Sequence, residues 1–295
     1  MKLGLWPAPH VAWPDLLALA EHAERTGWDA IWYADHFMPV EGDPQAPVRE
    51  CFTSLAALAV AVPRIRIGSL VAGNTYRHPA VLAKMAATLD ELSSGRFELG
   101  LGAAWQENEH RAYGIAFGSV GERLDRLEEA CEVIRGLFGG GPVSFAGRHY
   151  RLDGAVLSPR PVQRVLPLLV GGGGERRTLR IAARFADGWN VWGRPELLRH
   201  KGAVLDARCG EVGRDPAAIR RTAVAHVFVV DDPERAARLA ARPRATLAGD
   251  GDALRAELRA YADAGVDELV VPFFEAEPIA ERIARADALR TALRP

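Results

Sequence analysis

The chain has 295 residues, with 37 Lys and Arg against 38 Asp and Glu and a formal net charge of −1. This length fits either one large domain or two ordinary ones. The balanced charge leaves no basic excess to neutralise a phosphate backbone, so nucleic acid is not expected as a partner. Hydrophobic residues make up 48% of the chain, which supplies a large core and excludes intrinsic disorder.

No segment has the length of a membrane span or the pattern of a signal peptide. The longest uncharged stretch, 51–63, is shorter than the roughly 18 to 20 apolar residues that cross a bilayer. The apolar run at the N-terminus is interrupted by Pro7, Pro9 and Pro14. The three cysteines are far apart and form no Cys-x-x-Cys pair, so neither a disulfide framework nor a metal knuckle is expected. We therefore expect a cytoplasmic protein.

Short apolar runs alternate with longer amphipathic ones along the whole chain, and this pattern predicts repeated βα units. The expected strands are 2–6, 30–34, 65–72, 97–103, 166–171, 188–192, 219–230 and 268–274. The expected helices are 14–26, 51–62, 80–92, 124–138, 175–186, 195–212, 233–242, 252–265 and 278–293. The alternation lapses at about 139–167, where we expect an insertion with short strands that forms a lid or a structural flap.

Eight strands with intervening helices and no linker composition predict one (β/α)8 TIM barrel over residues 1–295. The alternative is an open doubly wound sheet, which would carry a Gly-x-Gly-x-x-Gly fingerprint for a dinucleotide. The glycine run 171–174 lacks that fingerprint, because Arg176 or Arg177 stands at the third glycine position. The barrel is therefore the favoured fold.

Loops after the strands build the ligand site of such a barrel. Asp35 and His36 follow the second expected strand, and Asn74 follows the third. A histidine there can donate or accept a proton near neutral pH, with Asp35 setting its tautomer or charge. The alternative is that the pair only closes the strand and caps the next turn.

The glycine run lies between an apolar strand and a helix expected to begin at Glu175. Its backbone N–H groups can converge on an anion, and a helix N-terminus adds partial positive charge. We expect a phosphate at this corner, a common place for one in barrels; the alternative is a tightly packed turn.

Other chemistries are poorly supported. Glu107, Glu109, His110 and Tyr113 lie close in sequence but lack the His-Glu-x-x-His spacing of a metal site. No Gly-x-Ser-x-Gly elbow is present, so nucleophilic hydrolysis is not expected either. We predict no metal.

Six motifs together make the sequence recognisable. They are YADHF (33–37), YRHPAVLAK (76–84), SGRFELGLGAAW (94–105), EHRAYG (109–114), GGGGERRTLR (171–180) and ADGWN (186–190). These motifs, in this order along the chain, resemble those of the luciferase-like monooxygenase superfamily. Within it, the chain resembles the coenzyme F420-dependent oxidoreductases. Each motif alone is weak, but together they span nearly the whole chain.

The resemblance implies a flavin or deazaflavin across the C-terminal mouth of the barrel, with its phosphate near the glycine run. The residue matching His36 sits beside the ring and handles the proton, with Glu109 as a second catalytic candidate. Residues matching Leu70 and Val71 form a non-prolyl cis peptide behind the ring. The full set of expected cofactor contacts is His36, Leu70, Val71, Asn74, Ala103, Trp105, Tyr113, Gly172, Gly173, Gly174 and Glu175.

Two departures from the family pattern stand out. Ala104 replaces a usual glycine, which would restrict the loop if its backbone needs a positive φ. Val165 and Leu166 replace a Pro-His pair, and no consequence follows from this change.

The leading functional hypothesis is hydride transfer between coenzyme F420 and a small organic substrate. The Asp35–His36 pair and the glycine run followed by Glu175 favour F420 by analogy within the superfamily. One alternative is an FMN-dependent monooxygenase that uses O2, and a second is a non-catalytic cofactor-binding protein. We expect a homo-oligomer, in the first instance a dimer, with no membrane partner.

The substrate pocket is expected to be shaped by loop 38–50, the insertion at 139–167 and side chains near Trp6, His10 and Trp192.

Overall fold

A computed structural model describes residues 1–275 and 277–293. Its main sheet has the strand order β3-β2-β1-β13-β10-β9-β8-β5-β4, and a further β3–β5 pairing closes it into a barrel. All of these neighbours are parallel. The strands are β1 (Lys2–Pro7), β2 (Ala30–Tyr33), β3 (Arg66–Ser69), β4 (Ala72–Gly73), β5 (Phe97–Gly102), β8 (Leu168–Gly171), β9 (Gly188–Trp192), β10 (Arg220–Val224) and β13 (Glu268–Phe273). Because β4 only continues β3, the barrel has eight strand positions, as predicted, and the open-sheet alternative is wrong.

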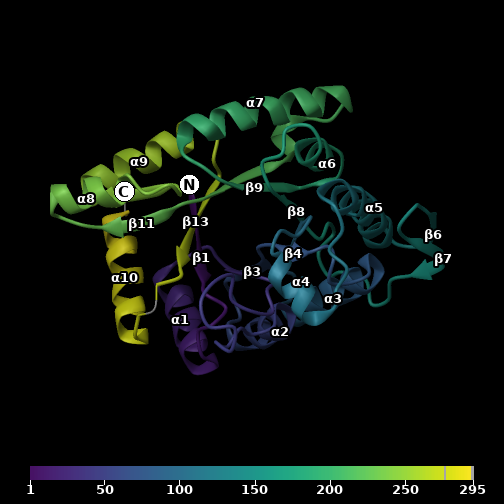
Figure 1. The fold of residues 1–295 in the computed structure, drawn as a ribbon, viewed down its shortest axis with the longest axis horizontal. Coiled ribbons are helices and arrows are strands. Elements are labelled where there is room, and N and C mark those ends of the chain that lie inside the picture. Colours follow the sequence, from purple (N-terminus) through teal and green to yellow (C-terminus); the bar gives the residue numbers. More distant parts are fainter. Residues whose placement is uncertain (276, 294–295) are drawn as a thin grey trace.

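Helices surround these strands (Figure 1). They are α1 (Trp13–Thr26), α2 (Cys51–Ala61), α3 (Pro79–Leu92), α4 (Glu107–Tyr113), α5 (Val120–Gly139), α6 (Thr178–Phe185), α7 (Pro195–Glu211), α8 (Pro233–Ala240), α9 (Gly251–Asp263) and α10 (Ile279–Ala292). Local signals explain their ends: a capping box of Ser119 and Glu122 starts α5, and Gly27 in the left-handed conformation ends α1. In the described residues no helix combines the length and hydropathy needed to cross a bilayer.

The third strand is interrupted between Ser69 and Ala72, where the Leu70–Val71 peptide bond is cis, as the family resemblance implied. Glycines on β5 leave room for this segment. A Cβ atom at Gly100 would lie 2.1 Å from the carbonyl oxygen of Ser69, and one at Gly102 would lie 2.7 Å from Cγ2 of Val71. The alternating glycines of β5 therefore serve a close approach of backbone and side chain.

The expected seventh strand, 219–230, is two strands. β10 belongs to the barrel, whereas β11 (His226–Val229) leaves it and pairs in parallel with β12 (Thr246–Gly249). Helix α8 connects the two, so β11, α8 and β12 form a βαβ unit at the left of Figure 1. The sequence did not predict β12, because Thr-Leu-Ala-Gly is too short to show a period between two helical segments.

The insertion contains an antiparallel hairpin of β6 (Pro142–Ala146) and β7 (Arg151–Val156), which projects at the right of Figure 1. The carboxylate of Glu129 on α5 accepts hydrogen bonds from the N–H groups of Arg148, His149 and Tyr150. The turn of the hairpin is thereby fastened to α5, which favours the expected structural flap over a lid.

Candidate active site

His36 and Glu109, the two residues predicted to be catalytic, are hydrogen-bonded to each other. His36 follows β2 and Glu109 lies on α4, and Nδ1 of His36 is 2.8 Å from Oε1 of Glu109. The Glu109 side chain is fully buried, whereas that of His36 keeps 21% of its surface exposed. An ionised carboxylate only accepts hydrogen bonds, so Nδ1 carries the proton. Nε2 has no hydrogen-bond partner among the described residues and is left to meet a ligand.

Glu109 is surrounded by donors. Oε2 accepts the N–H of Phe37 at 2.7 Å, and Oε1 also accepts the hydroxyl of Tyr76. Burial alone would raise the pKa of Glu109, but the hydrogen bonds from His36, Phe37 and Tyr76 outweigh it and hold the pKa below its ordinary value. Burial and the neighbouring Glu109 charge raise the pKa of Tyr76, which therefore remains a donor. The carboxylate is thus kept ionised beside His36.

Asp35 does not set the state of His36. Its carboxylate receives the Gly73 N–H at 3.0 Å and two hydrogen bonds from Arg77, at 2.7 and 3.1 Å. Consecutive side chains leaving a strand point to opposite sides, so Asp35 turns toward the loop after β4 while His36 turns toward α4. The expectation that Asp35 governs His36 is wrong, and Glu109 has that place.

Aromatic side chains stand beside His36. The ring of Trp105 meets that of His36 edge to face, with centroids 5.5 Å apart. The hydroxyl of Tyr113 donates to the carbonyl of Phe37 at 3.2 Å. Trp105 is 58% exposed and Tyr113 is 60% exposed, which is unusual for such large rings. They form an open aromatic wall next to the histidine.

Asn74 and Ala103 lie at the ends of neighbouring strands. The Asn74 N–H donates to the carbonyl of Gly102 at 2.9 Å, and its side chain is buried. Its Oδ1 atom has no partner within the described chain. A buried acceptor left unpaired is costly, so this atom fits a donor supplied by a ligand. Ala103 is half-buried directly after β5.

Ala104 has a φ of +61°, in the left-handed region that its β-carbon disfavours. The departure from the family's glycine therefore has a structural cost. We expect Ala104→Gly to raise the free energy of unfolding by about 0.5–1 kcal/mol. Urea denaturation measures this change, with Ala103→Gly as the control. A variant no more stable than wild type would contradict the assigned strain.

The glycine run has unpaired backbone donors. The N–H groups of Gly173 and Gly174 have no hydrogen bond among the described residues. A Cβ atom would lie 3.0 Å from Val191 Cγ2 at Gly173 and 2.8 Å from Thr178 Oγ1 at Gly174, so a side chain at either position would force a neighbour to shift. The result is a bare backbone surface suited to an anion.

The helix after this run begins at Thr178, three residues later than expected, because a turn occupies 175–177. Glu175 in that turn faces α7, where its Oε1 is 2.6 Å from Nζ of Lys201 and 2.9 Å from Nε2 of His200. Its side chain makes no hydrogen bond to His36 or Glu109. Glu175 is therefore placed at the rim of the glycine run and not with the catalytic pair.

A second aromatic group contains Trp6 and Trp192, whose ring centroids are 6.1 Å apart. The Trp6 ring also meets Phe274 at 5.0 Å, and the Trp192 ring lies 5.4 Å from His226. Trp6, Trp192 and Val71 all pack against one buried cluster inside the barrel. The two tryptophans therefore share one buried cluster with Val71, and their part in the substrate pocket stays a prediction.

Tyr76 was missed as a site residue by the sequence analysis. The sequence offered one sign of its role: Tyr76 lies two residues after Asn74, in the loop that follows the third expected strand. Within the described part of the chain, no three His, Cys, Asp or Glu side chains gather as metal ligands would.

Residues 1–270 match the family described as luciferase-like monooxygenase. The chain belongs to this family. The predicted family and barrel are thereby confirmed.

Two curated relatives of this chain are named after F420. The chain is 34% identical over 229 residues to the F420-dependent hydroxymycolic acid dehydrogenase of Mycobacterium tuberculosis, a match covering 76% of this chain and 61% of the relative. It is 34% identical over 242 residues to the F420-dependent glucose-6-phosphate dehydrogenase of Kineococcus radiotolerans. This match covers 80% of this chain and 70% of the relative. The chain thus spans less than two thirds of the length of the first relative.

A solved structure has the same fold. An F420-dependent secondary alcohol dehydrogenase, in complex with an F420-acetone adduct, superposes with a TM-score of 0.86 at 22% identity. The alignment covers 100% of this chain and 99% of that one, which again shows the barrel.

Proposed function

We propose that this protein is an F420-dependent oxidoreductase that transfers a hydride between the deazaflavin and a small organic substrate. The observation that carries the proposal is the His36–Glu109 pair, in which a buried carboxylate fixes Nδ1 and leaves Nε2 without a protein partner. The names of both curated relatives support the choice of F420.

The residues present fit such a cofactor. Gly173 and Gly174, whose N–H groups are free among the described residues, would take its phosphate, whereas the N–H of Gly172 already donates to the carbonyl of Asn190 at 2.9 Å. Lys201 lies nearby, with its Cε 3.8 Å from the Cβ position of Gly173, and its charge is offset by Glu175. The unpaired Oδ1 of Asn74 would accept a hydrogen bond from it.

The ring would lie against Leu70 and Val71 near Ala103, and Trp105 and Tyr113 would line the cofactor's tail. The Glu175 carboxylate is already engaged by Lys201 and His200, so this residue would contribute through its backbone.

When bound, the deazaflavin supplies or accepts a hydride at one ring carbon. Interconversion of a carbonyl and an alcohol also moves one proton at oxygen. Nε2 of His36 gives this proton in the direction of reduction and takes it in the direction of oxidation. Glu109 holds the imidazole in one orientation and offsets its positive charge when it is protonated. Trp105, edge-on to His36 at 5.5 Å, packs against one side of the imidazole.

Anaerobic turnover tests the proposal. Reduced F420 is mixed without O2 with a panel of aldehydes, ketones and unsaturated acids, and reoxidation of the cofactor is followed by absorbance. We expect reoxidation with at least one compound class. Conversion that requires reduced FMN and O2 would identify a monooxygenase instead, and tight F420 binding without any conversion would identify a non-catalytic binding protein.

Three further expectations stay predictions: one functional domain over the whole chain, a homodimer, and a place in the cytoplasm.

A further inference from the structure

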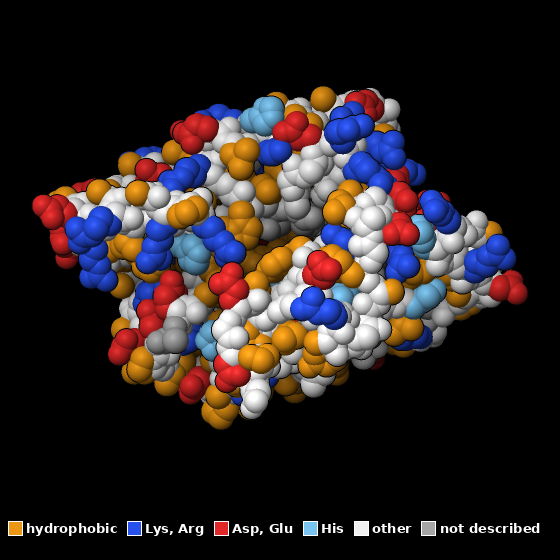
Figure 2. Space-filling model, viewed as in Figure 1, with side chains coloured by type: hydrophobic (Ala, Val, Ile, Leu, Met, Phe, Trp, Pro, Cys, Tyr) orange, Lys and Arg blue, Asp and Glu red, His pale blue; other side chains and the backbone are white. Residues whose placement is uncertain are grey.

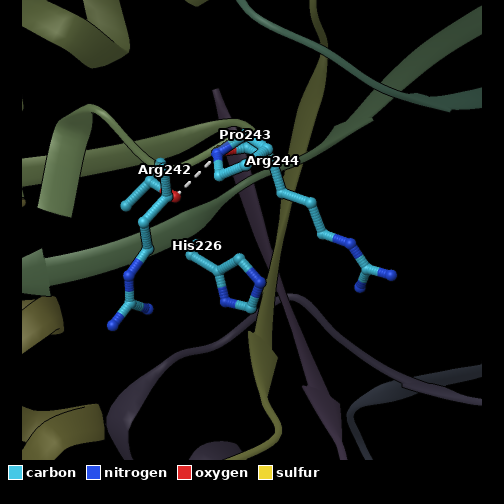
Figure 3. Close-up of a pocket in the computed structure, with 5 residues that line it drawn as sticks. His226, Arg242, Pro243 and Arg244 are labelled. Atoms are coloured by element: carbon cyan, nitrogen blue, oxygen red, sulfur yellow. Dashed lines mark hydrogen bonds between the residues drawn. The ribbon is translucent and has the colours of Figure 1, made fainter.

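A pocket of about 330 Å³ lies in the βαβ unit of β11, α8 and β12. It is lined by His226, Arg242, Pro243, Arg244 and Thr246. Figure 3 shows the imidazole of His226 between the two arginine side chains, which extend from one loop to opposite sides of the ring. We call these three residues, His226, Arg242 and Arg244, the basic pocket.

The two arginines of the basic pocket lack counter-ions. Within the described residues neither guanidinium has a carboxylate partner or a hydrogen-bond acceptor; Arg242 packs over Phe228 at 5.2 Å and Arg244 over Trp192 at 5.3 Å. The nearby acid Glu275 is held at 2.7 Å by Arg285, so its charge is already offset. Two positive charges at one concave surface without a protein anion fit a bound carboxylate or phosphate.

His226 adds an unpaired polar atom to the same place. Its Nδ1 is buried and has no partner in the described part of the chain. Burial lowers the pKa of His226; Arg244, Arg242 and Arg285 lower it further, against the opposing effect of Glu275. Burial and the arginines therefore favour the neutral imidazole, which lines the pocket with one buried ring nitrogen unpaired.

The basic pocket lies across the barrel from the cis peptide. In the closed strand order, β3 and β10 occupy opposite positions, and β10 leads directly into His226. Trp192 joins the two sides, because it contacts the His226 ring and packs on the same buried cluster as Val71. Figure 2 shows a hollow in this face of the molecule, with hydrophobic side chains inside and both basic and acidic side chains along its rim.

We propose that the basic pocket binds the anionic group of the substrate. This group is a carboxylate or a phosphate ester, and the rest of the substrate is apolar. The body lies against Trp6 and Trp192, and the reacting carbonyl or alcohol carbon faces His36. This inference rests on the proposed function, because it takes His36 as the reacting end of the site.

Calorimetric titration with simple probes tests the basic pocket. Phenylacetate and phenyl phosphate are the anionic probes, and phenylacetamide is the neutral one. In wild type with F420 bound, we expect each anion to bind at least about tenfold more tightly than the amide, the size expected of charge-assisted hydrogen bonds. In the double variant Arg242→Gln/Arg244→Gln, anion affinity should fall at least about tenfold while amide affinity is unchanged.

A matched control removes two arginines from the same unit. Arg235 and Arg238 are exposed on α8 outside the pocket, so Arg235→Gln/Arg238→Gln changes the net charge equally. It should leave anion binding within about twofold of wild type. If both double variants lost the same anion affinity, the effect would come from net charge alone and the proposal would be overturned. Equal affinity of wild type for the anions and the amide would overturn it too.

Titration of the same variants with F420 distinguishes the substrate from the cofactor's own anionic tail. We expect the F420 dissociation constant of the pocket variant to stay within about threefold of wild type. A loss of F420 affinity with unchanged probe binding would assign the pocket to the cofactor and overturn the proposal. If wild type binds no F420, the proposed function fails, whereas probe titration of the cofactor-free protein still decides whether the pocket takes anions.

Discussion

Replacement of His36 by alanine is expected to lower turnover by about 10²- to 10⁴-fold, the usual contribution of a positioned acid or base. The reason is the geometry of the ring: Nδ1 is bound to Glu109 at 2.8 Å, so Nε2 is the atom available to move a proton. Alanine removes that atom but leaves the glycine run and Asn74, and the dissociation constant of F420 should change by less than about fivefold. Steady-state kinetics and cofactor titration measure the two quantities separately.

His22→Ala is the matched control for this change. His22 is also paired with a carboxylate, Asp287, at 2.7 Å, but it lies on α1 on the outside of the barrel. Its loss should leave turnover within about twofold of wild type. If His36→Ala kept full turnover with normal cofactor binding, His36 would have no part in the reaction.

Replacement of Glu109 by glutamine is expected to lower turnover by about 10- to 100-fold, because a hydrogen bond to a charged group contributes about 1.5–3 kcal/mol. Glutamine keeps the shape but loses the charge that offsets a protonated His36. Its amide also brings a donor into a site where Phe37, Tyr76 and His36 already donate. Glu107→Gln, on the exposed face of the same helix, is the control and should have little effect on turnover.

The stability of the Glu109→Gln variant has an expected pH dependence. The pKa of Glu109 is lower in the folded protein than in the unfolded chain, so its carboxylate contributes stability that is fully present above the unfolded value of about 4.3. This contribution is lost as pH falls further, through the folded pKa. Urea denaturation should therefore show a larger stability difference between wild type and variant at pH 7 than at pH 4, and a constant difference would contradict the assigned role of the carboxylate.

The sequence was sufficient for the barrel because its signals are local and repeated. Each buried parallel strand is a short apolar run. Each helix has apolar residues at helical spacing and a residue that ends it, such as Gly27 after α1. The glycine run and the histidine after β2 could be placed for the same reason: in a barrel, position after a strand determines the face on which a residue lies.

Contacts between distant segments were harder to predict. The sequence suggested that Asp35 governs His36 because they are adjacent, yet the partner is Glu109, 73 positions away. Tyr76 reaches the same carboxylate from a third loop. The pairing follows from how α4 and the β4 loop fold over the end of β2, which no local period encodes.

The basic pocket was missed for a related reason. His226 lay inside the expected strand 219–230, and Arg242 was the last residue of the expected helix 233–242. Arg244 lay in the stretch between two expected helices, to which no element was assigned. Only the pairing of β11 with β12 brings these three residues together, and β12 is too short to give a signal of its own.

Parallel titration of one purified preparation with F420 and with FMN, followed by quenching of cofactor fluorescence, tests the central claim most directly. The account predicts that F420 binds at least about tenfold more tightly than FMN. Tight binding of FMN with no binding of F420 would contradict it.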